Sequence, residues 1–197
     1  MSSKLLVSVI ALAFVAGCAR ESHEWHAKSI RGLMPPLEFT LTSENGQEVS
    51  AQDYRGKTVL LFFGYTNCPD YCPTTLSRLK LALDKLPDLR SQVVILFVSV
   101  DPKRDTLEYL RQYTSNFAPE VIGLTGSMKA LSELAKRYRT TFSYGEPDEH
   151  GFYAVSHGIA VYAFDTAGAA RLMMLQEEKP DEIAADIKQL VELGDSP

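Results

Sequence analysis

Apolar residues along this chain form short continuous runs that alternate with stretches of helical spacing. The runs 58-TVLLFFGYT-66 and 93-VVILFVSV-100 are typical of strands buried on both faces of a parallel sheet. Between them, leucines recur over 76–86 at the spacing of one helix face. A strand, a helix and a second strand in this order indicate the core of an α/β fold.

The alternation of strands and helices continues towards the C-terminus. We expect helices over 105–117 and 127–139, with Asp105 and Ser127 as their N-caps. A short strand near Val121–Leu124 lies between them. This repeating order predicts helices on both faces of one sheet.

Turn signals predict hairpins near both ends of the domain. The alternating segment 37-LEFTLTSENGQEVS-50 surrounds an Asn-Gly pair, a strong hairpin signal. The runs 157-HGIAVYAFD-165 and 169-AARLMML-175 predict an antiparallel pair, and a final amphipathic helix covers about 180–194. Residues 140–155 show no clear period and predict a loop or a small inserted hairpin. The fold class is therefore α/β, a central mixed sheet flanked by helices, with an N-terminal hairpin.

Composition and charge are those of one globular domain with additional segments. The 197 residues are 45% hydrophobic, which is ample for one packed core. The net charge is −5, with acidic and basic residues interspersed. No dense basic face is available to neutralise phosphates, so we expect no nucleic-acid partner.

The N-terminus carries the pattern of an export signal. Lys4 precedes an apolar run over 5–16 that is too short to span a bilayer as a helix but fits the core of a signal peptide. The run ends in 15-VAGC-18, which looks like the lipobox of bacterial lipoproteins. That resemblance implies cleavage before Cys18 and attachment of lipid to it, which would hold the protein at a membrane. An ordinary signal peptide with a chance cysteine and an uncleaved anchor are the alternatives.

We therefore divide the chain into a signal peptide over 1–17, a polar tether over 18–32 and one domain over 33–197. Each of the three interpretations of the N-terminus exports the domain, so its compartment is expected to be oxidising. If the cysteine of the lipobox carries lipid, two cysteines remain in the chain. No disulfide framework beyond that single pair is then possible.

These two cysteines, Cys68 and Cys72, stand in 64-GYTNCPDYCPTT-75, between a predicted strand and a predicted helix. Unpaired amides and the dipole at a helix N-terminus stabilise a thiolate. Thioredoxin-like redox proteins use C-x-x-C at the same place, and the spacing here is one residue longer. The two sulfurs can converge on one metal ion or come close enough to form a disulfide. A purely structural bridge is disfavoured, because closing so short a loop removes little entropy from the unfolded chain.

The ligand types narrow the choice of metal. Two thiolates favour Cu(I) or Zn(II), and an imidazole would make the site acceptable to copper in either oxidation state. His23 and His26 lie in the predicted tether and His150 stands beside acidic residues, so we interpret these three as solvated. His157 stands at the entrance of an apolar strand, and it is either a ligand or a histidine hydrogen-bonded at a strand end.

Three blocks of the sequence, 63-FGYTNCPDYCPTTL-76, 97-FVSVDPKRDT-106 and 153-YAVSHGIAVYAFD-165, resemble the Sco/SenC family of copper chaperones for cytochrome c oxidase. The blocks come in the family's order, and the similarity covers roughly residues 33–193. This resemblance implies a thioredoxin-like fold with a small insertion before the histidine strand.

The resemblance also implies a ligand set and a task. One copper ion, as Cu(I) or Cu(II), is expected to be bound by Cys68, Cys72 and His157. The protein would deliver this ion to, or prepare, the binuclear copper site of cytochrome c oxidase subunit II. It would act from the periplasmic face of the cytoplasmic membrane, and other periplasmic copper carriers or thiol reductants are further expected partners.

Some positions leave alternatives open. Many family members carry Asp immediately before the histidine, where this chain has Ser156, so a carboxylate that could orient the imidazole is absent there. Asp101 and Arg104 match the family's second block. Either Asp101 caps a turn and Arg104 pairs with a nearby carboxylate, or the two residues surround the metal ligands or shape a rim for partner docking.

A metal-transfer protein, and so not an enzyme, is the first functional hypothesis. A thiol–disulfide oxidoreductase acting on the cysteines of subunit II is the alternative, because the fold and a thiolate at a helix N-terminus permit that chemistry. A peroxidase of the peroxiredoxin type fits less well. Thr66 stands only two residues before Cys68, and the upstream proline of the peroxiredoxin motif is missing.

Overall fold

The computed structural model describes residues 24–194, whose strands form one large sheet and one small sheet. The large sheet has eight strands in the order β1-β10-β9-β4-β5-β6-β2-β3, and β7 pairs with β8 in the small sheet. The strands are β1 (Lys28–Ser29), β2 (Thr40–Ser43), β3 (Glu48–Ser50), β4 (Thr58–Gly64), β5 (Val93–Ser99), β6 (Val121–Thr125), β7 (Phe142–Tyr144), β8 (Val155–His157), β9 (Val161–Phe164) and β10 (Ala170–Met174).

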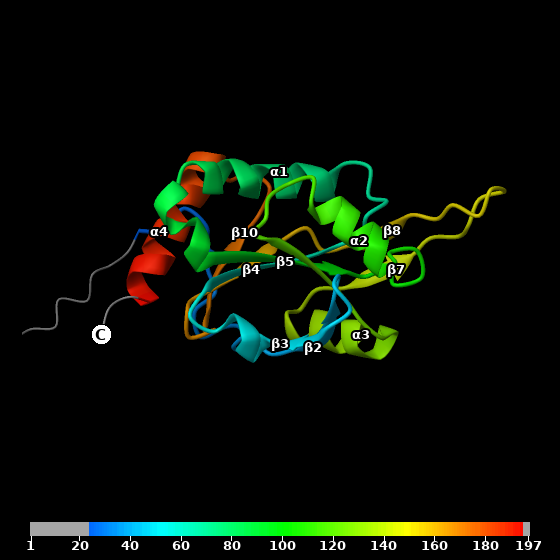
Figure 1. Cartoon of the computed structure of the whole chain (residues 1–197), viewed down its shortest axis with the longest axis horizontal. Coiled ribbons are helices and arrows are strands. Elements are labelled where there is room, and N and C mark those ends of the chain that lie inside the picture. Colours follow the sequence, from blue (N-terminus) through cyan, green and yellow to red (C-terminus); the bar gives the residue numbers. More distant parts are fainter. Residues whose placement is uncertain (1–23, 195–197) are drawn as a thin grey trace, which may run out of the picture.

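Helices cover both faces of the large sheet, as the alternating pattern predicts. The α-helices are α1 (Tyr71–Asp84), α2 (Leu107–Thr114), α3 (Met128–Arg137) and α4 (Pro180–Gly194), and the 3-10 helices are η1 (Ala51–Tyr54) and η2 (Pro87–Gln92). α1 and α4 pack together on one face, and α3 lies on the other (Figure 1). β4, β5 and β6 run parallel, whereas β9 and β2 join them antiparallel. The predicted α/β class with a central mixed sheet is confirmed.

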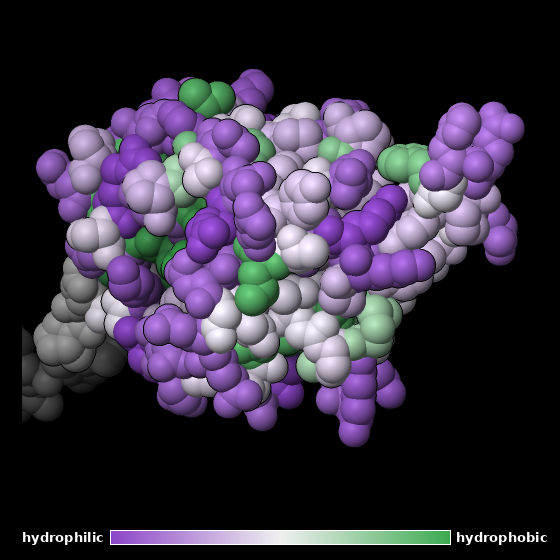
Figure 2. All heavy atoms as spheres, turned by 45° about the vertical axis from the view of Figure 1, so that its right-hand side comes forward, coloured by the Kyte–Doolittle hydropathy of each residue, from purple (hydrophilic) through white to green (hydrophobic). Residues whose placement is uncertain are grey.

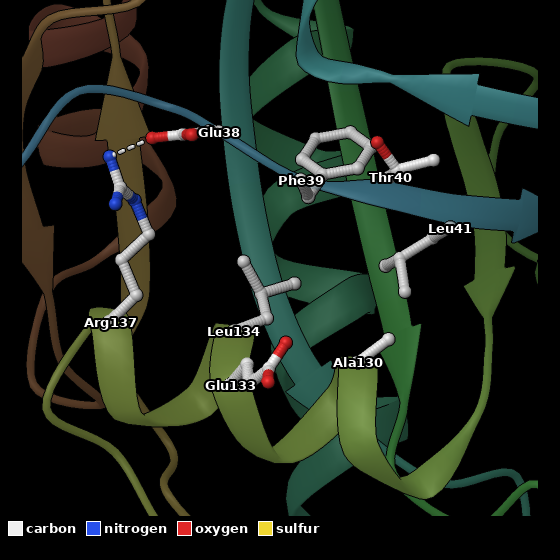
Figure 3. A pocket seen from close by; sticks show the side chains of 8 residues that line it. All are labelled: Glu38, Phe39, Thr40, Leu41, Ala130, Glu133, Leu134 and Arg137. Carbon is white, nitrogen blue, oxygen red and sulfur yellow. Dashed lines mark ion pairs between the residues drawn. The ribbon is translucent and has the colours of Figure 1, made fainter.

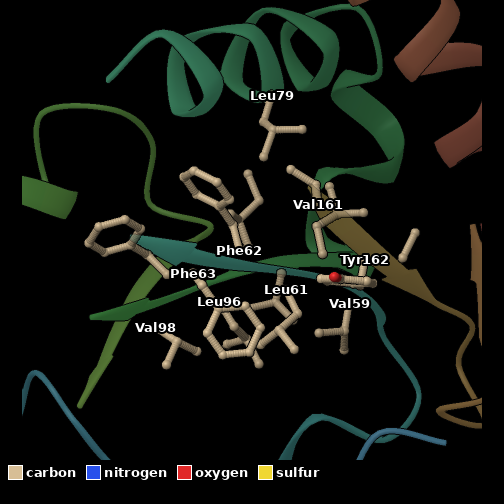
Figure 4. Packing of buried hydrophobic residues seen from close by; sticks show 14 of the residues in the cluster. Val59, Leu61, Phe62, Phe63, Leu79, Leu96, Val98, Val161 and Tyr162 are labelled. Carbon is tan, nitrogen blue, oxygen red and sulfur yellow. The ribbon is translucent and has the colours of Figure 1, made fainter. Parts of the chain in front are cut away.

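The two most apolar runs form the centre of the sheet. All residues of β4 and β5 are buried, and the strands pair in parallel along their full length, with Gly64 opposite Ser99 at the end. Side chains alternate between the faces, so Phe62 points toward Leu79 of α1 while Val98 points to the other side (Figure 4). Burial on both faces explains why neither run alternates polar with apolar residues.

One predicted helix start is wrong and another is confirmed. In α2 the N-cap is Thr106, whose side-chain oxygen accepts a hydrogen bond from the amide of Tyr109 at 3.3 Å. Asp105, which we predicted to be this cap, is instead buried, and its carboxylate accepts a hydrogen bond from the hydroxyl of Thr66. In α3 the cap is Ser127 as predicted, and its side chain accepts from the amide of Ala130 at 3.2 Å.

The inserted segment over 140–155 forms most of a hairpin. β7 and β8 are its paired strands, and its end projects from the body of the domain (Figure 1). The side chains at this projecting end are mostly hydrophilic, as the upper right of Figure 2 shows. We expected His157 at the entrance to a strand over 157–165, but it is the last residue of β8, and β9 begins only at Val161. The imidazole is therefore carried by the inserted hairpin and not by the central sheet.

The polar segment before the domain packs on the domain. β1 pairs antiparallel with β10, and Ala27 and Ile30 are buried. The buried carboxylate of Asp186 on α4 accepts hydrogen bonds from the amides of His26 at 3.0 Å and Ala27 at 2.8 Å. We expected a tether over 18–32, but these contacts hold its residues 26–30 against β10 and α4.

The N-terminal predictions lie outside the described residues. These are the signal peptide over 1–17, the lipid on Cys18 and the interpretation of His23. Within the described part of the chain, no helix is both long enough and apolar enough to cross a membrane. The described N-terminal segment lies beside α4, at the opposite end of the molecule from the projecting hairpin (Figure 1).

We predict that Asp186→Ala destabilises the domain by about 1–3 kcal/mol, because it leaves two buried or half-buried amides without an acceptor. Urea unfolding measures this loss, and hydrogen exchange at the amides of His26 and Ala27 should become faster. Lys188→Ala on the same helix is the control. Its exposed ion pair with Glu192 contributes little, so a change below about 0.5 kcal/mol is expected. Equal effects of the two substitutions would contradict the prediction.

Candidate metal centre

The loop between β4 and α1 presents both cysteines at one end of the sheet. Cys72 lies in the first turn of α1 and is fully buried, whereas Cys68 lies in the preceding loop and is 8% exposed. Both are free thiols. Amides in the first turn of a helix have no partner within the helix, so the position can stabilise a thiolate as the sequence indicated.

The three predicted ligands come together. The ligand atoms of Cys68, Cys72 and His157 all lie within 4.8 Å of one another. The Nε2 atom of His157 lies 3.4 Å from the Sγ atom of Cys72, and its Nδ1 atom lies 2.9 Å from the carbonyl oxygen of Gly158. A carbonyl oxygen only accepts, so Nδ1 carries the proton of the neutral ring. Nε2 therefore turns its free lone pair toward the sulfurs, as a metal ligand does.

Aromatic side chains seat the imidazole against the elements that carry the cysteines. The ring of His157 meets the ring of Phe62 edge-on, with centroids 6.2 Å apart. It meets Tyr65 in the same way at 5.7 Å. Phe62 belongs to β4 and Tyr65 begins the cysteine loop. The hairpin thus brings its histidine onto the strand and loop that position the sulfurs.

The two cysteine side chains differ in acidity because they interact with each other. The interaction with the Cys72 side chain holds the pKa of Cys68 well below its ordinary value, and the backbone amides of Cys72 and Asp70 add to this effect. The interaction with Cys68 and the burial of Cys72 raise the pKa of Cys72. Cys68 is therefore the thiolate, the form of cysteine that binds a metal or attacks a disulfide.

A buried carboxylate that we did not assign to the site holds the cysteine loop in place. Asp105 accepts hydrogen bonds from the amide and hydroxyl of Thr66, at 2.9 and 2.6 Å, and from the hydroxyl of Ser99 at 2.5 Å. Burial raises the pKa of Asp105, and these hydrogen bonds act in the opposite direction. The order of the strands could have indicated that Asp105 lies near the cysteine loop. Asp105 and that loop follow neighbouring parallel strands, and loops after such strands meet at the same edge of a sheet.

Asp101 and Arg104 form the expected ion pair, and it reaches across to the inserted hairpin. Asp101 is fully buried, and the Nε atom of Arg104 donates to its carboxylate. The hydroxyl of Tyr153 donates to the same carboxylate at 2.8 Å. The Nη1 atom of Arg104 donates to the carbonyl oxygen of Tyr153, also at 2.8 Å. The ion pair of Asp101 and Arg104 is thus bonded to the segment that leads to the histidine.

The remaining candidates lie away from the sulfurs. His26 is exposed and contributes its amide to the contact with α4. His150 is exposed at the end of the hairpin, where its Nε2 atom lies 3.5 Å from Glu149. Ser156 is exposed and adjacent to His157 in β8. Neighbouring residues of a strand point to opposite faces, so a carboxylate at this position would not face the sulfurs.

A pocket of about 430 Å³ lies between α3 and the segment that leads into β2 (Figure 3). It is lined by Glu38, Phe39, Thr40, Leu41, Ala130, Glu133, Leu134 and Arg137. Glu38 and Arg137 form an ion pair of 2.5 Å at one end of it. None of its lining residues is a cysteine or a histidine, so we assign no part of the metal centre to it.

Comparison of the sequence with known proteins identifies relatives over most of the described residues. The sequence model of the SCO1/SenC family matches residues 35–192. The human mitochondrial SCO1 homolog is 35% identical over 151 residues, which cover 76% of this chain and 50% of that protein. The mouse mitochondrial SCO2 homolog is 39% identical over 134 residues, which cover 66% of this chain and 52% of that protein. The chain thus spans about half the length of these relatives.

Solved structures share the fold. A copper-bound ScoI from Bradyrhizobium japonicum superimposes with a TM-score of 0.72 and 34% identity, over 79% of this chain and 98% of that one. Apo Sco1 from Thermus thermophilus superimposes with a TM-score of 0.75 and 35% identity, over 86% of this chain and 99% of that one. The thioredoxin-like fold expected from the sequence is therefore confirmed.

We predict that Gly64→Ala displaces the buried thiol, because Gly64 leaves room for Cys72. A Cβ atom at position 64 would lie 2.7 Å from the Sγ atom of Cys72 and 2.5 Å from Cε2 of Phe97, both too close for contact. Overpacking of this kind costs about 1–3 kcal/mol. Urea unfolding measures that cost, and faster alkylation of Cys72 by iodoacetamide reports the displacement.

Gly145→Ala is the matched control for this substitution. Its new Cβ atom would meet its nearest neighbour, a backbone oxygen, at 3.4 Å, which is a tolerable contact. Unchanged Cys72 reactivity in Gly64→Ala, or an equal change in both variants, would show that the space beside Cys72 is not limiting.

Proposed function

The chain belongs to the SCO1/SenC family, and from this premise we propose that it binds one copper ion through Cys68, Cys72 and His157 and passes it on. The observation that carries the proposal is the convergence of two sulfurs and one imidazole nitrogen within 4.8 Å. Copper in this proposal is a cargo, held until an acceptor takes it. The copper-bound ScoI of Bradyrhizobium japonicum, which is 34% identical, supports the choice of metal.

The donor set suits copper in particular. Thiolates are soft ligands that select Cu(I), and an imidazole is acceptable to both Cu(I) and Cu(II). The free lone pair on Nε2 of His157 needs no proton to leave before it binds. Cys68 is already favoured as thiolate, so only the proton of Cys72 has to depart when the ion enters.

The proposed acceptor is the binuclear copper site of cytochrome c oxidase subunit II. A site with three ligands leaves a coordination position for a ligand of the acceptor, so the ion can pass from one protein to the other by exchange. Cys68 is the more exposed sulfur and offers the route by which an acceptor approaches. Other periplasmic copper carriers are the proposed source of the ion.

We also propose where the protein works. Lipid on Cys18 would anchor it at the periplasmic face of the cytoplasmic membrane, after removal of residues 1–17. The site lies at the end of the sheet where the hairpin projects, and the N-terminal segment lies at the other end (Figure 1). A protein anchored through that segment would leave its metal centre free to meet a partner.

We predict that the exported domain, reduced and free of metal, binds one equivalent of Cu(I) in competition with a chromogenic chelator. His157→Ala should weaken this binding by at least about 10-fold, and Cys72→Ala should weaken it further, because a thiolate is the stronger ligand for Cu(I). His150→Ala, an exposed histidine on the same hairpin, is the control and should leave the affinity unchanged. Unaltered stoichiometry and affinity in the His157→Ala, Cys72→Ala double variant would sink the proposed site.

Thiol–disulfide exchange with subunit II is the second candidate function, and the unequal cysteines favour it. The Cys68 thiolate would attack a disulfide of the partner, forming a mixed disulfide and releasing one partner thiolate. Cys72 would then lose its proton and attack Cys68, forming an intramolecular disulfide and freeing the second partner thiol. The pair is oxidised and the partner reduced, so a thiol reductant must restore Cys68 and Cys72.

We predict that Cys72→Ser accumulates a mixed disulfide with an oxidised peptide carrying the subunit's cysteine pair, because the resolving sulfur is missing. Cys68→Ser is the matched variant and should form far less, since its remaining thiol is fully buried, which hides it from the peptide and raises its pKa. Non-reducing gels and mass spectrometry measure the adduct. Equal adduct in the two variants, or none in either, would leave metal transfer as the function of the pair.

A further inference from the structure

We propose that Arg104 is a positioning residue for His157, acting with Asp101 and Tyr153 to hold the histidine in reach of the sulfurs. This inference rests on the proposed function and deepens it. These three residues form a latch between the hairpin and the loop after β5, and the latch holds the third ligand while other groups hold most of the cysteine segment.

The latch is a closed set of contacts among three residues. The Nε atom of Arg104 donates to Asp101, and its Nη1 atom donates to the carbonyl oxygen of Tyr153 at 2.8 Å. The hydroxyl of Tyr153 donates to Asp101 at 2.8 Å, and the guanidinium carbon lies 3.7 Å from the centre of the Tyr153 ring. Asp101 is fully buried, so leaving its carboxylate unpaired would be costly. This cost favours the arrangement in which Arg104 and Tyr153 both remain bonded to Asp101.

The latch acts on the histidine because it is bonded to the same segment, whose apolar contacts with the core are those of Phe142, Tyr153 and the buried Val155. Tyr153 stands four residues before His157 in the same segment. β7 and β8 have three residues each, and a two-stranded hairpin of this size is at best marginally stable alone. The projecting end is mostly hydrophilic and exposed (Figure 2), and the ring of Phe152 there contacts Arg104 itself, with the guanidinium carbon 5.6 Å from its centre. Near the domain, Tyr144 donates to the carbonyl oxygen of Val100 at 2.5 Å, and this bond joins the hairpin to the same loop.

The guanidinium group of Arg104 also contacts an aromatic ring that packs against the imidazole of His157. The Arg104 guanidinium carbon lies 5.6 Å from the centre of the Tyr65 ring, and that ring meets the His157 ring at 5.7 Å. Arg104 therefore contacts both the segment that carries the histidine and the ring that packs against it. Lysine could pair with Asp101, but its ammonium group is not planar, so it could not stack flat on the Tyr153 ring while donating to the same two acceptors.

The cysteines are held mainly by contacts other than those of the latch, whose one link to the cysteine loop is the contact of Arg104 with the Tyr65 ring. Cys72 is part of α1, and the loop that carries Cys68 is bonded through Thr66 to Asp105. The hydrogen bonds and salt bridge of Arg104 go to other groups. Loss of the latch should therefore remove the contribution of the histidine and leave that of the two sulfurs.

A double-mutant cycle on the exported domain tests this separation. Arg104→Lys should lower the affinity for Cu(I), measured by chelator competition, about 10-fold, which is the scale of losses when a group that orients a metal ligand is removed. In the His157→Ala background the same substitution should change the affinity by less than about 2-fold, because no imidazole is left to position. With Cu(II) bound, Arg104→Lys should also reduce the nitrogen hyperfine coupling in the electron paramagnetic resonance spectrum.

One further variant weakens the latch in a second way, and another serves as a control. Tyr153→Phe removes only the hydroxyl that donates to Asp101, so it should show the same dependence on His157 if Arg104→Lys fails to fold. Arg90→Lys disrupts a comparable pair with Glu120, whose oxygens lie 2.8 Å from the guanidinium, and should leave copper affinity unchanged.

The outcomes separate the inference from the proposed function. An equal loss of affinity with and without His157, or no loss at all, would overturn the positioning role while leaving the ligand set intact. An affinity that is the same in His157→Ala as in the unaltered protein would overturn the ligand set itself, and the positioning role with it.

Discussion

The metal centre depends on the register of two parallel strands. β4 and β5 pair along their full length and end together at Gly64 and Ser99, so the loops that follow them begin side by side. Asp105 then joins the two, because its buried carboxylate accepts hydrogen bonds from Thr66 in the cysteine loop and from Ser99 at the end of β5. An unpaired carboxylate in this environment would be costly, so the loop has little freedom to leave.

The two halves of the centre differ in how firmly the fold holds them. The cysteines lie on one short segment between a fully buried strand and a helix. The histidine comes from 85 residues beyond Cys72, on a hairpin that projects from the domain and is joined to it mainly by polar and aromatic contacts. Opening of a weakly held segment requires less free energy than unfolding of the core. A site built in this way can keep two ligands in place while the third moves.

Copper binding and disulfide exchange draw on the same sulfurs and exclude one another at any moment. A disulfide cannot bind copper as two thiolates, and a bound ion occupies the sulfur that would attack a partner. The interaction between the two side chains lowers the pKa of Cys68 and raises that of Cys72, so Cys68 is the more acidic of the pair. Both proposed functions therefore start from the reduced pair, and the oxidised pair supports neither until a thiol reductant restores it.

The sequence by itself determined the order of strands and helices, the hairpin around the Asn-Gly turn and the identity of the cysteine pair. Periodicity, turn chemistry and motif spacing are local, and they can be read without knowing what packs against what. The tertiary structure alone decided that Asp105 braces the cysteine loop instead of capping α2, that His157 ends a strand of the inserted hairpin, and that Arg104 bonds to Tyr153. These contacts join residues far apart in the chain, so they depend on strand register and side-chain packing, which no local pattern specifies.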